Sequence, residues 1–260
     1  MLFRSEMSQL AKVQELLRTL RLTETAFHLP VLVKQAETNE MTYLRFLSIV
    51  LQYEQDCREK KARERRLKWA AFPYYKTLDE FQLDEQPSLT KRQFHQLREL
   101  AWLDQLFNLI LLGPPGVGKT HLAIGLGMEA IDQGYKVTFI TMGELIQALK
   151  TEEITRKSRI RLQRLRESNL VIIDDLMFMA MDQREANLFF HLINDLYNQS
   201  SIILTSNKGP SEWGELLGDP AITTAVLDRI IHRAEVIHLN GDSYRMKHRI
   251  SIFSDETVQN

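Results

Sequence analysis

The sequence predicts an α/β fold: a five-stranded, mostly parallel sheet with helices on both faces, preceded by a small all-α domain. Apolar residues recur at helical spacing in the N-terminal part of the chain. Further on, short β-rich runs alternate with helical segments, and one of these runs ends in a glycine-rich turn. Strands separated by helices usually pair in parallel and are covered on both faces. Binding residues are then expected at the carboxyl ends of the strands.

The N-terminal domain is expected to comprise residues 1–70 and to be helical. Apolar side chains recur at steps of three and four residues along Leu10–Leu20 and again along Leu44–Leu51. Asn39 is expected to cap the second of these helices. Residues 71–90 contain several turn-forming residues and are expected to be a linker or strap into the next domain.

The larger domain, residues 91–260, is expected to contain five strands and the helices between them. The strands are predicted at Leu109–Leu112, Lys136–Ile140, Asn169–Ile173, Ser201–Thr205 and Glu235–Leu239. Helices are predicted at Lys91–Asp104, from about Lys119 onward, and at Met142 to about Arg166, Arg184–Asn198 and Ala221–His232. The chain ends soon after the fifth strand, so a full helical lid is not expected.

The composition is that of a soluble globular protein. With 260 residues, of which 44% are hydrophobic, the chain can bury a full core. It has no long uninterrupted apolar run and no signal-peptide pattern at its N-terminus, so a cytoplasmic protein that does not associate with membranes is expected. Cys57 is the only cysteine, which excludes an intrachain disulfide and a cysteine-based zinc site.

A glycine-rich turn after the first predicted strand carries the clearest chemical signal. Its glycines allow close backbone approaches, and its N–H groups converge with the positive end of the following helix on one concavity. Lys119 is expected to reach the β- and γ-phosphates of a nucleotide, and the Thr120 hydroxyl to ligate Mg²⁺. We therefore expect ATP and Mg²⁺ as ligands. The predicted ATP-binding residues are Gly113, Pro114, Pro115, Gly116, Val117, Gly118, Lys119, Thr120 and His121.

Polar side chains follow two other predicted strands. Asp174 and Asp175 end an apolar run, where Asp174 is suited to hold Mg²⁺ and Asp175 to orient or deprotonate the attacking water. Asn207 follows the next strand and is suited to bond the γ-phosphate or the same water. These residues predict a site for nucleotide hydrolysis.

Two basic runs are candidates for DNA contact. Residues 57–68 hold seven Lys or Arg against two Glu. They are expected to form either a nucleic-acid-binding surface or the solvated end of a helix whose neighbouring aromatic residues pack on the next domain. Residues 154–166 hold six Lys or Arg and no acid. On a helix, the basic residues of this second run can form a cationic ridge, while Ile154, Leu162 and Leu165 anchor the helix. The ridge would face DNA phosphates, a neighbouring subunit or only solvent. The candidate DNA contacts are Lys60, Lys61, Arg63, Arg65, Arg66, Lys68, Arg156, Lys157, Arg159, Arg161 and Arg164.

Several of these motifs together resemble a known family. The glycine-rich loop, the Asp174-Asp175 strand end, Thr205-Ser206-Asn207, and the segments Trp213–Pro220 and Leu227–His232 resemble the IstB-type transposition helper ATPases. Those proteins belong to the AAA+ superfamily and are similar to the helicase loader DnaC and the initiator DnaA. The resemblance implies a DNA-associated ATPase that binds and hydrolyses ATP, oligomerises on duplex DNA and assists a transposase in target selection or transposition.

The resemblance also assigns roles to single residues. Asn207 matches the sensor position, and Arg229 matches the arginine finger that completes the site of a neighbouring subunit. Asp175 stands where most AAA+ enzymes have Glu. Arg245 is a candidate for the second sensor arginine. The catalytic set is therefore expected to be Lys119, Asp175, Asn207 and Arg229.

Three alternative functions share the same loop. A replicative helicase loader of the DnaC type differs in its partner and not in its chemistry. A small-molecule kinase would require an acceptor pocket and a closing lid, for which the sequence offers no evident residues. A nucleotide switch that does not hydrolyse ATP would follow if Asp175 is too short to act as a base.

Overall fold

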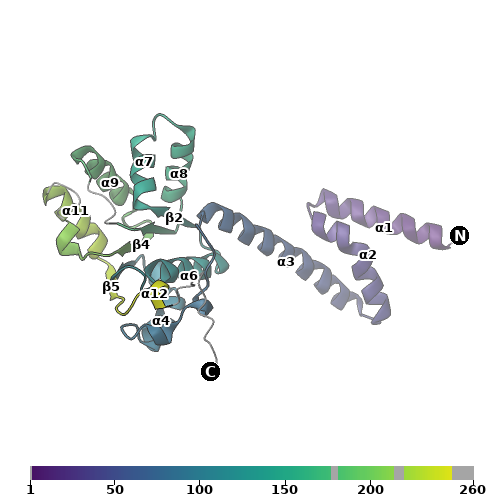
Figure 1. Ribbon diagram of the computed structural model, residues 1–260. Coiled ribbons are helices and arrows are strands. Elements are labelled where there is room, and N and C mark those ends of the chain that lie inside the picture. The colour runs from purple at the N-terminus through teal and green to yellow at the C-terminus, as the bar shows by residue number, and fades with distance from the viewer. Residues whose placement is uncertain (1, 177–180, 214–219, 248–260) are drawn as a thin grey trace, which may run out of the picture. The chain divides into compact units, whose positions relative to one another are not determined.

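The computed structural model describes residues 2–176, 181–213 and 220–247 (Figure 1). Their contacts divide the chain into two compact units, Met1–Arg65 and Arg66–Asn260. No helix in the described part of the chain is long and apolar enough to cross a membrane.

The first unit consists of helices α1 (Leu2–Thr19), α2 (Thr23–Thr38) and the greater part of α3 (Tyr43–Ala70). Its buried apolar side chains include Ala26, Leu29 and Leu32 of α2. Buried Glu54 of α3 accepts hydrogen bonds from the Thr25 backbone N–H at 3.2 Å and from the Thr25 hydroxyl at 2.7 Å. This unit is helical, as the sequence predicts, but α2 was not among the predicted helices.

The expected capping role of Asn39 is wrong. Asn39 terminates α2, where its backbone N–H donates to Gln35 and Glu37 carbonyls. The start of α3 is capped instead by Thr42, whose hydroxyl accepts from the Arg45 N–H at 3.4 Å. A hydroxyl directly before the first helical turn satisfies one of its unpaired N–H groups, and Asn39 lies too far upstream to do so.

The second unit is built on a fully parallel five-stranded sheet in the order β2-β3-β4-β1-β5. The strands are β1 (Asn108–Leu112), β2 (Val137–Thr141), β3 (Leu170–Asp174), β4 (Ser201–Ser206) and β5 (Ala234–His238). Each end of every strand lies within one residue of its predicted position. β1, β3 and β4 are buried along their whole length, because other strands flank them and helices cover both faces.

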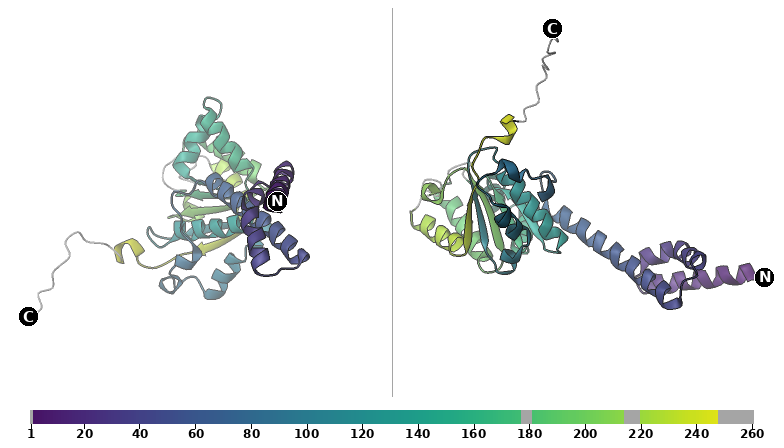
Figure 2. Two further views of the ribbon diagram at one scale, coloured as in Figure 1. Left: turned by 90° about the vertical axis from the view of Figure 1, so that its right-hand side faces the viewer. Right: turned by 90° about the horizontal axis from the view of Figure 1, so that it is seen from below.

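Helices lie on both faces of the sheet (Figure 1, Figure 2), and alternate residues of the strands belong to two separate apolar layers. On β1, Ile110 and Leu112 pack with one layer, and Leu109 and Leu111 pack with the other. The first layer contains α7 (Met142–Lys150), α8 (Arg156–Arg166), α9 (Gln183–Leu196) and α11 (Pro220–Ile231). The second contains α4 (Lys91–Arg98), α5 (Ala101–Asp104) and α6 (Lys119–Asp132). The predicted α/β class with helices on both faces is therefore confirmed.

Two predicted helices are each broken in two. The helix predicted from Met142 to about Arg166 is α7 and α8, because α7 ends at Lys150 and the Thr155 hydroxyl caps a new helix by accepting from the Ser158 N–H at 3.2 Å. One straight helix of that length would extend about 37 Å, beyond a strand of this sheet. The turn brings Leu162 and Leu165 back into the core, but it leaves Ile154, expected as a third anchor, 79% exposed.

The helix predicted over Lys91–Asp104 is likewise α4 and α5. Leu100 interrupts it with a left-handed backbone (φ +60°) while its side chain is buried. Residues 71–90, predicted as a linker or strap, belong to the second unit. They contain the short helices η1 (Leu78–Glu80) and η2 (Leu83–Glu85). Leu78, Phe81 and Leu89 of this strap join the core layer of α6. Other short helices in the described part of the chain are η3 (Pro210–Glu212) and α12 (Tyr244–Lys247).

Candidate functional site

A cavity of about 750 Å³ lies at the carboxyl ends of the strands. The loop residues from Pro115 to His121 line it, together with Asp174, Asp175 and Asn207. Parallel strands bring these residues together because all their carboxyl ends lie at one edge of the sheet. The predicted loop and strand-end residues therefore occupy a single site.

The loop connects β1 to α6 and is fixed at its first residue. Gly113 donates its N–H to the Ser206 carbonyl of β4 at 3.3 Å and has a φ of +147°. A Cβ on Gly113 would lie 2.0 Å from the Leu239 carbonyl oxygen, so only glycine fits here. The N–H groups of Gly116, Val117 and Gly118 donate to no other group among the described residues. They are free to bond the oxygens of a phosphate.

Lys119 lies inside this loop. Its Nζ donates to the Gly113 carbonyl at 2.7 Å, the Pro114 carbonyl at 2.9 Å and Asn207 Oδ1 at 2.7 Å. Burial lowers the pKa of Lys119, although Asp175 and Asp174 act in the opposite direction. Its three hydrogen-bond acceptors are neutral, so a phosphate would offset the cost of burying the ammonium group.

Asp174 and Thr120 form the second half of the site. The Thr120 hydroxyl lies 2.9 Å from Oδ1 and 3.2 Å from Oδ2 of Asp174. Burial raises the pKa of the Asp174 carboxyl, while the hydroxyls of Thr205 and Thr120 counteract part of the shift. A bound cation would favour the ionised carboxylate. A carboxylate beside a hydroxyl is the kind of oxygen donor set that Mg²⁺ prefers, so these residues fit the metal.

Apart from Arg245, sequence reasoning did not identify the other walls of the cavity, which come from the strap and from the segment after β5. The Gln86 side chain donates to the Val117 carbonyl at 2.5 Å, and His121 Nε2 lies 3.0 Å from the Thr77 carbonyl. The Tyr244 N–H donates to the Gly116 carbonyl at 3.0 Å. Arg245, the candidate second sensor, lines the same cavity.

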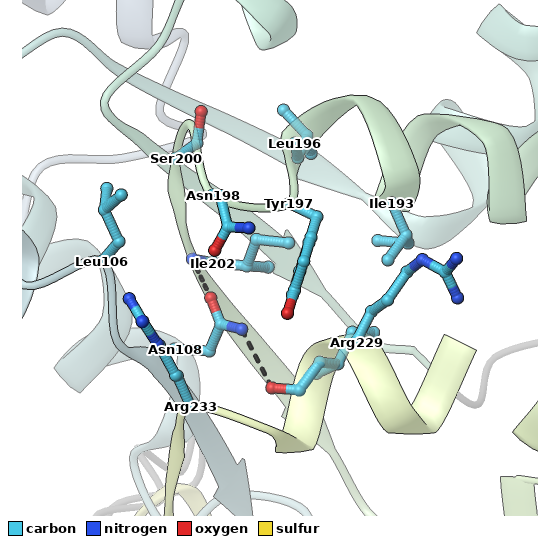
Figure 3. Close-up of a pocket in the computed structure, with 11 residues that line it drawn as sticks. Leu106, Asn108, Ile193, Leu196, Tyr197, Asn198, Ser200, Ile202, Arg229 and Arg233 are labelled. Atoms are coloured by element: carbon cyan, nitrogen blue, oxygen red, sulfur yellow. Dashed lines mark hydrogen bonds between the residues drawn. The ribbon is translucent and has the colours of Figure 1, made fainter. Parts of the chain in front are cut away.

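Arg229 lies elsewhere. It is not among the residues that line the cavity of its own chain. It borders a small depression on the α9 and α11 side. In the view of Figure 3, Tyr197 is drawn between Asn108 and the Arg229 side chain. Its Nε donates to Asn194 Oδ1 at 3.2 Å, one Nη donates to the Ala225 carbonyl at 2.9 Å, and its guanidinium lies 4.9 Å from the Phe190 ring centre. The Asn108 side chain links this region to the sheet, since it bonds the Ile230 carbonyl and the Ile202 N–H.

The basic residues of α8 fall into two groups. Arg161 is half-buried and donates to the Phe139 carbonyl at 2.6 Å, and Arg164 lies over the Trp69 ring at 5.2 Å. Arg166 pairs with Glu152 at 2.6 Å and with Asp195 at 3.1 Å. The cations that remain exposed on this helix are Arg156, Lys157 and Arg159.

The basic residues of α3 also differ in their contacts. Lys61 pairs with Glu24 at 2.5 Å in the first unit, and Arg66 donates to the Ile131 carbonyl at 3.1 Å in the second. Arg63 is half-buried and has an interaction partner. Exposed cations on this helix include Lys60, Arg65 and Lys68.

The segment Trp213–Pro220 is described only at its two ends. Trp213 is fully buried, and its indole N–H donates to the Lys208 carbonyl at 3.2 Å. Gly214, Gly218 and Asp219, which contributed to the sequence resemblance, lie outside the described residues.

Comparison with known proteins identifies the family. The model of the IstB-like ATP binding protein family matches residues 15–251. A Pseudomonas aeruginosa protein named for insertion sequence IS21 and for ATP binding is 40% identical over 238 residues, covering 92% of this chain and 90% of that protein. A Bacteroides fragilis protein with an IS21-like name is 38% identical over 258 residues and covers 98% of both chains.

The fold is also found in a solved structure of the replication initiator DnaA bound to AMPPCP and single-stranded DNA. That chain is 26% identical with a TM-score of 0.52, and the match covers 68% of this chain and 53% of DnaA. This protein therefore spans about half the length of DnaA. The AAA+ fold and the family match both agree with a loop that is suited to bind phosphate. Because the family model matches most of its length, the chain belongs to the IstB-like ATP-binding proteins of insertion sequences.

Proposed function

We propose that this protein is a Mg²⁺-dependent ATPase that assembles on duplex DNA and assists a transposase in choosing or engaging its target. One observation supports the ATPase part most strongly. Lys119, the Thr120–Asp174 pair, Asp175 and Asn207 come from three separate segments and line one cavity. This is the set of groups that phosphoryl transfer to water requires.

Each of these residues has a proposed role in hydrolysis. Lys119 exchanges its bonds to loop carbonyls for bonds to the β- and γ-phosphates, while Thr120 and Asp174 hold Mg²⁺. When bound, Mg²⁺ would neutralise charge on the phosphate oxygens. Asp175 orients the attacking water and accepts its proton as the bond between the γ-phosphorus and the bridging oxygen breaks. Asn207 bonds Lys119 and is placed to bond the γ-phosphate.

We propose that the active form is a homo-oligomer in which Arg229 completes the site of a neighbouring subunit. The supporting observation is that Arg229 is not among the residues that line its own cavity and that its guanidinium is held by Asn194 and Phe190 on α9. The γ-phosphoryl transition state spreads charge over its equatorial oxygens, and a guanidinium would compensate the part that the Lys119 ammonium leaves.

The proposed DNA and transposase partners are supported in different ways. Exposed cations on α8 and α3 suit the phosphate backbone. The relatives are named for insertion sequences, which favours a transposition role over helicase loading. DnaA, which has the same fold, has a structure with single-stranded DNA. The cavity lining includes Asp175 and Asn207, which suit hydrolysis and give no support to a kinase role.

The ATPase proposal is tested by measuring ATP affinity and phosphate release, each with and without DNA and Mg²⁺. Lys119→Ala should lose ATP binding while remaining folded at the assay temperature, because a charge-assisted phosphate contact is removed from a loop. Lys91→Ala, at an exposed lysine that starts α4, is the matched control and should bind ATP normally. ATP binding without any Mg²⁺-dependent phosphate release would establish a nucleotide switch instead.

The partner proposal has its own test. The product of the reading frame beside this gene, which we expect to be a transposase, is mixed with the protein, ATP and labelled duplex DNA, and complex formation and strand transfer are measured. We expect strand transfer to require the protein and to fail with Lys119→Ala. Strand transfer that is equally efficient and equally placed without the protein would refute the helper role.

A further inference from the structure

Thr205, the fifth residue of β4, makes an unusual set of bonds to the neighbouring strand end. Its Oγ1 donates to Asp174 Oδ1 at 2.6 Å and accepts from the Asp175 N–H at 3.0 Å. Its backbone carbonyl accepts from the Leu176 N–H at 3.0 Å. Three consecutive residues at the tip of β3 are thus bound to one residue of β4, whose side chain is fully buried.

The direction of the two side-chain bonds is determined by their partners. A backbone N–H only donates and an ionised carboxylate only accepts, so the single hydroxyl proton of Thr205 must point at Asp174. Among side chains of this size, only a hydroxyl both donates and accepts strongly. Valine has nearly the same shape but would leave the buried Asp174 carboxylate and the Asp175 N–H without these bonds.

Asp175 depends on this arrangement more than an ordinary residue would. Its φ of +59° lies in the left-handed region, which residues with a side chain rarely adopt. The bond from its N–H to Thr205 holds this conformation, in which Asp175 lines the cavity directly after Asp174. Without that bond the backbone is free to relax to an ordinary conformation and turn the carboxylate away.

The same strand end also reaches the phosphate loop. Asn207 lies two residues after Thr205 and accepts a bond from Lys119 Nζ at 2.7 Å. We propose that Thr205 is a positioning residue that orients Asp174 toward Mg²⁺ and Asp175 toward the attacking water. This inference rests on the proposed ATPase function and adds a residue to which the family comparison assigns no role.

The test compares Thr205→Val with the original protein. Turnover should fall about 10- to 100-fold, the effect of losing one hydrogen bond to a charged group, while KM for ATP changes little. The Mg²⁺ concentration for half-maximal nucleotide binding should rise, because Asp174 loses one of its two hydroxyl donors. Thr205→Ser keeps both bonds and should rescue turnover and Mg²⁺ dependence.

A second measurement needs neither nucleotide nor activity. Amide hydrogen exchange at Asp175 should be slow in the original protein and in Thr205→Ser, and faster in Thr205→Val, because its N–H bonds the hydroxyl. If Thr205→Val does not fold, Thr205→Cys is measured in the same way, since it keeps the volume with a weaker donor and acceptor.

Thr138→Val is the matched control. Thr138 lies on β2, is equally buried, and its hydroxyl lies 2.7 Å from that of Ser168, away from the cavity. If Thr205→Val loses no more turnover than Thr138→Val and keeps slow exchange at Asp175, the inference is wrong. If the original protein releases no phosphate from ATP, the ATPase proposal fails instead, and the exchange rate at Asp175 still decides whether Thr205 holds it.

Discussion

Arg229→Ala should separate the catalytic role of this arginine from its contribution to the fold. In its own chain the substitution removes two hydrogen bonds and a cation–π contact. These contribute about 1.5–4 kcal/mol to the free energy of unfolding, at about 0.5–1.5 kcal/mol per hydrogen bond and about 0.5–1 kcal/mol for the ring contact. An arginine finger contributes about a thousandfold to a hundred-thousandfold in turnover, or about 4–7 kcal/mol.

Asn194→Ala is the matched control for the structural contribution. It removes the side-chain acceptor of the same guanidinium but leaves the charge in place. Both variants should therefore unfold at somewhat lower temperature and bind ATP normally. Only Arg229→Ala should lose phosphate release, and it should do so even at temperatures where it is fully folded.

The assay for action between subunits mixes two inactive proteins. Arg229→Ala has an intact loop, and Lys119→Ala has an intact finger, so some mixed interfaces combine both. Phosphate release should then return in part and vary with the mixing ratio. The interpretation is refuted if the mixture stays inactive while the two proteins are shown to co-assemble.

Three further predictions concern other parts of the chain. Asp175→Asn should keep ATP and Mg²⁺ binding but lose phosphate release, since Asp174 and Thr120 hold the metal; surviving turnover would assign the base elsewhere. Alanine at three exposed cations should flatten the salt dependence of DNA binding by about 0.9 in log–log slope per lost phosphate contact, whereas alanine at Arg161, which bonds the Phe139 carbonyl, should not. Those three cations are Arg156, Lys157 and Arg159. Burial alone would raise the pKa of Glu54, but the hydrogen bonds from Thr25 and Arg58 outweigh it and lower the pKa. Its stabilising effect is therefore present above the unfolded pKa of about 4.3 and is lost as pH falls through the lower folded value. Thermal unfolding of Glu54→Gln, followed by circular dichroism, should lack this acid dependence.

The parallel sheet was predictable from the sequence because its strands carry their signal locally. Each is a short apolar run, and each run is followed by a turn or by a polar strand end. Helix α2 carries a weaker signal. Its buried side chains are Thr25, Ala26, Leu29 and Leu32, so a polar and a small residue replace half of the apolar pattern. Pro30 lies inside the same helix, and because proline is unfavourable in a helix interior, it further weakens the helical pattern of the sequence.

The central residues of the candidate site were predictable for the same reason. The loop has a local pattern, and parallel pairing brings the ends of β1, β3 and β4 to one edge. The outer walls were not predictable, because their contacts join segments far apart in the chain. Gln86 bonds a carbonyl 31 residues away, and Ser88 accepts from the Asn240 N–H across 152 residues. Nothing in the local pattern of residues 71–90 indicates a partner.

Two glycines inside α6 show how the strap and the phosphate loop are connected. A Cβ on Gly125 would lie 2.4 Å from Leu78 Cδ2, and a Cβ on Gly127 would lie 2.8 Å from a Phe72 ring carbon. Glycine is otherwise unfavourable within a helix by about 1 kcal/mol relative to alanine. These glycines therefore let the strap approach the helix that begins at Lys119, so the strap wall and the loop are positioned by one rigid element.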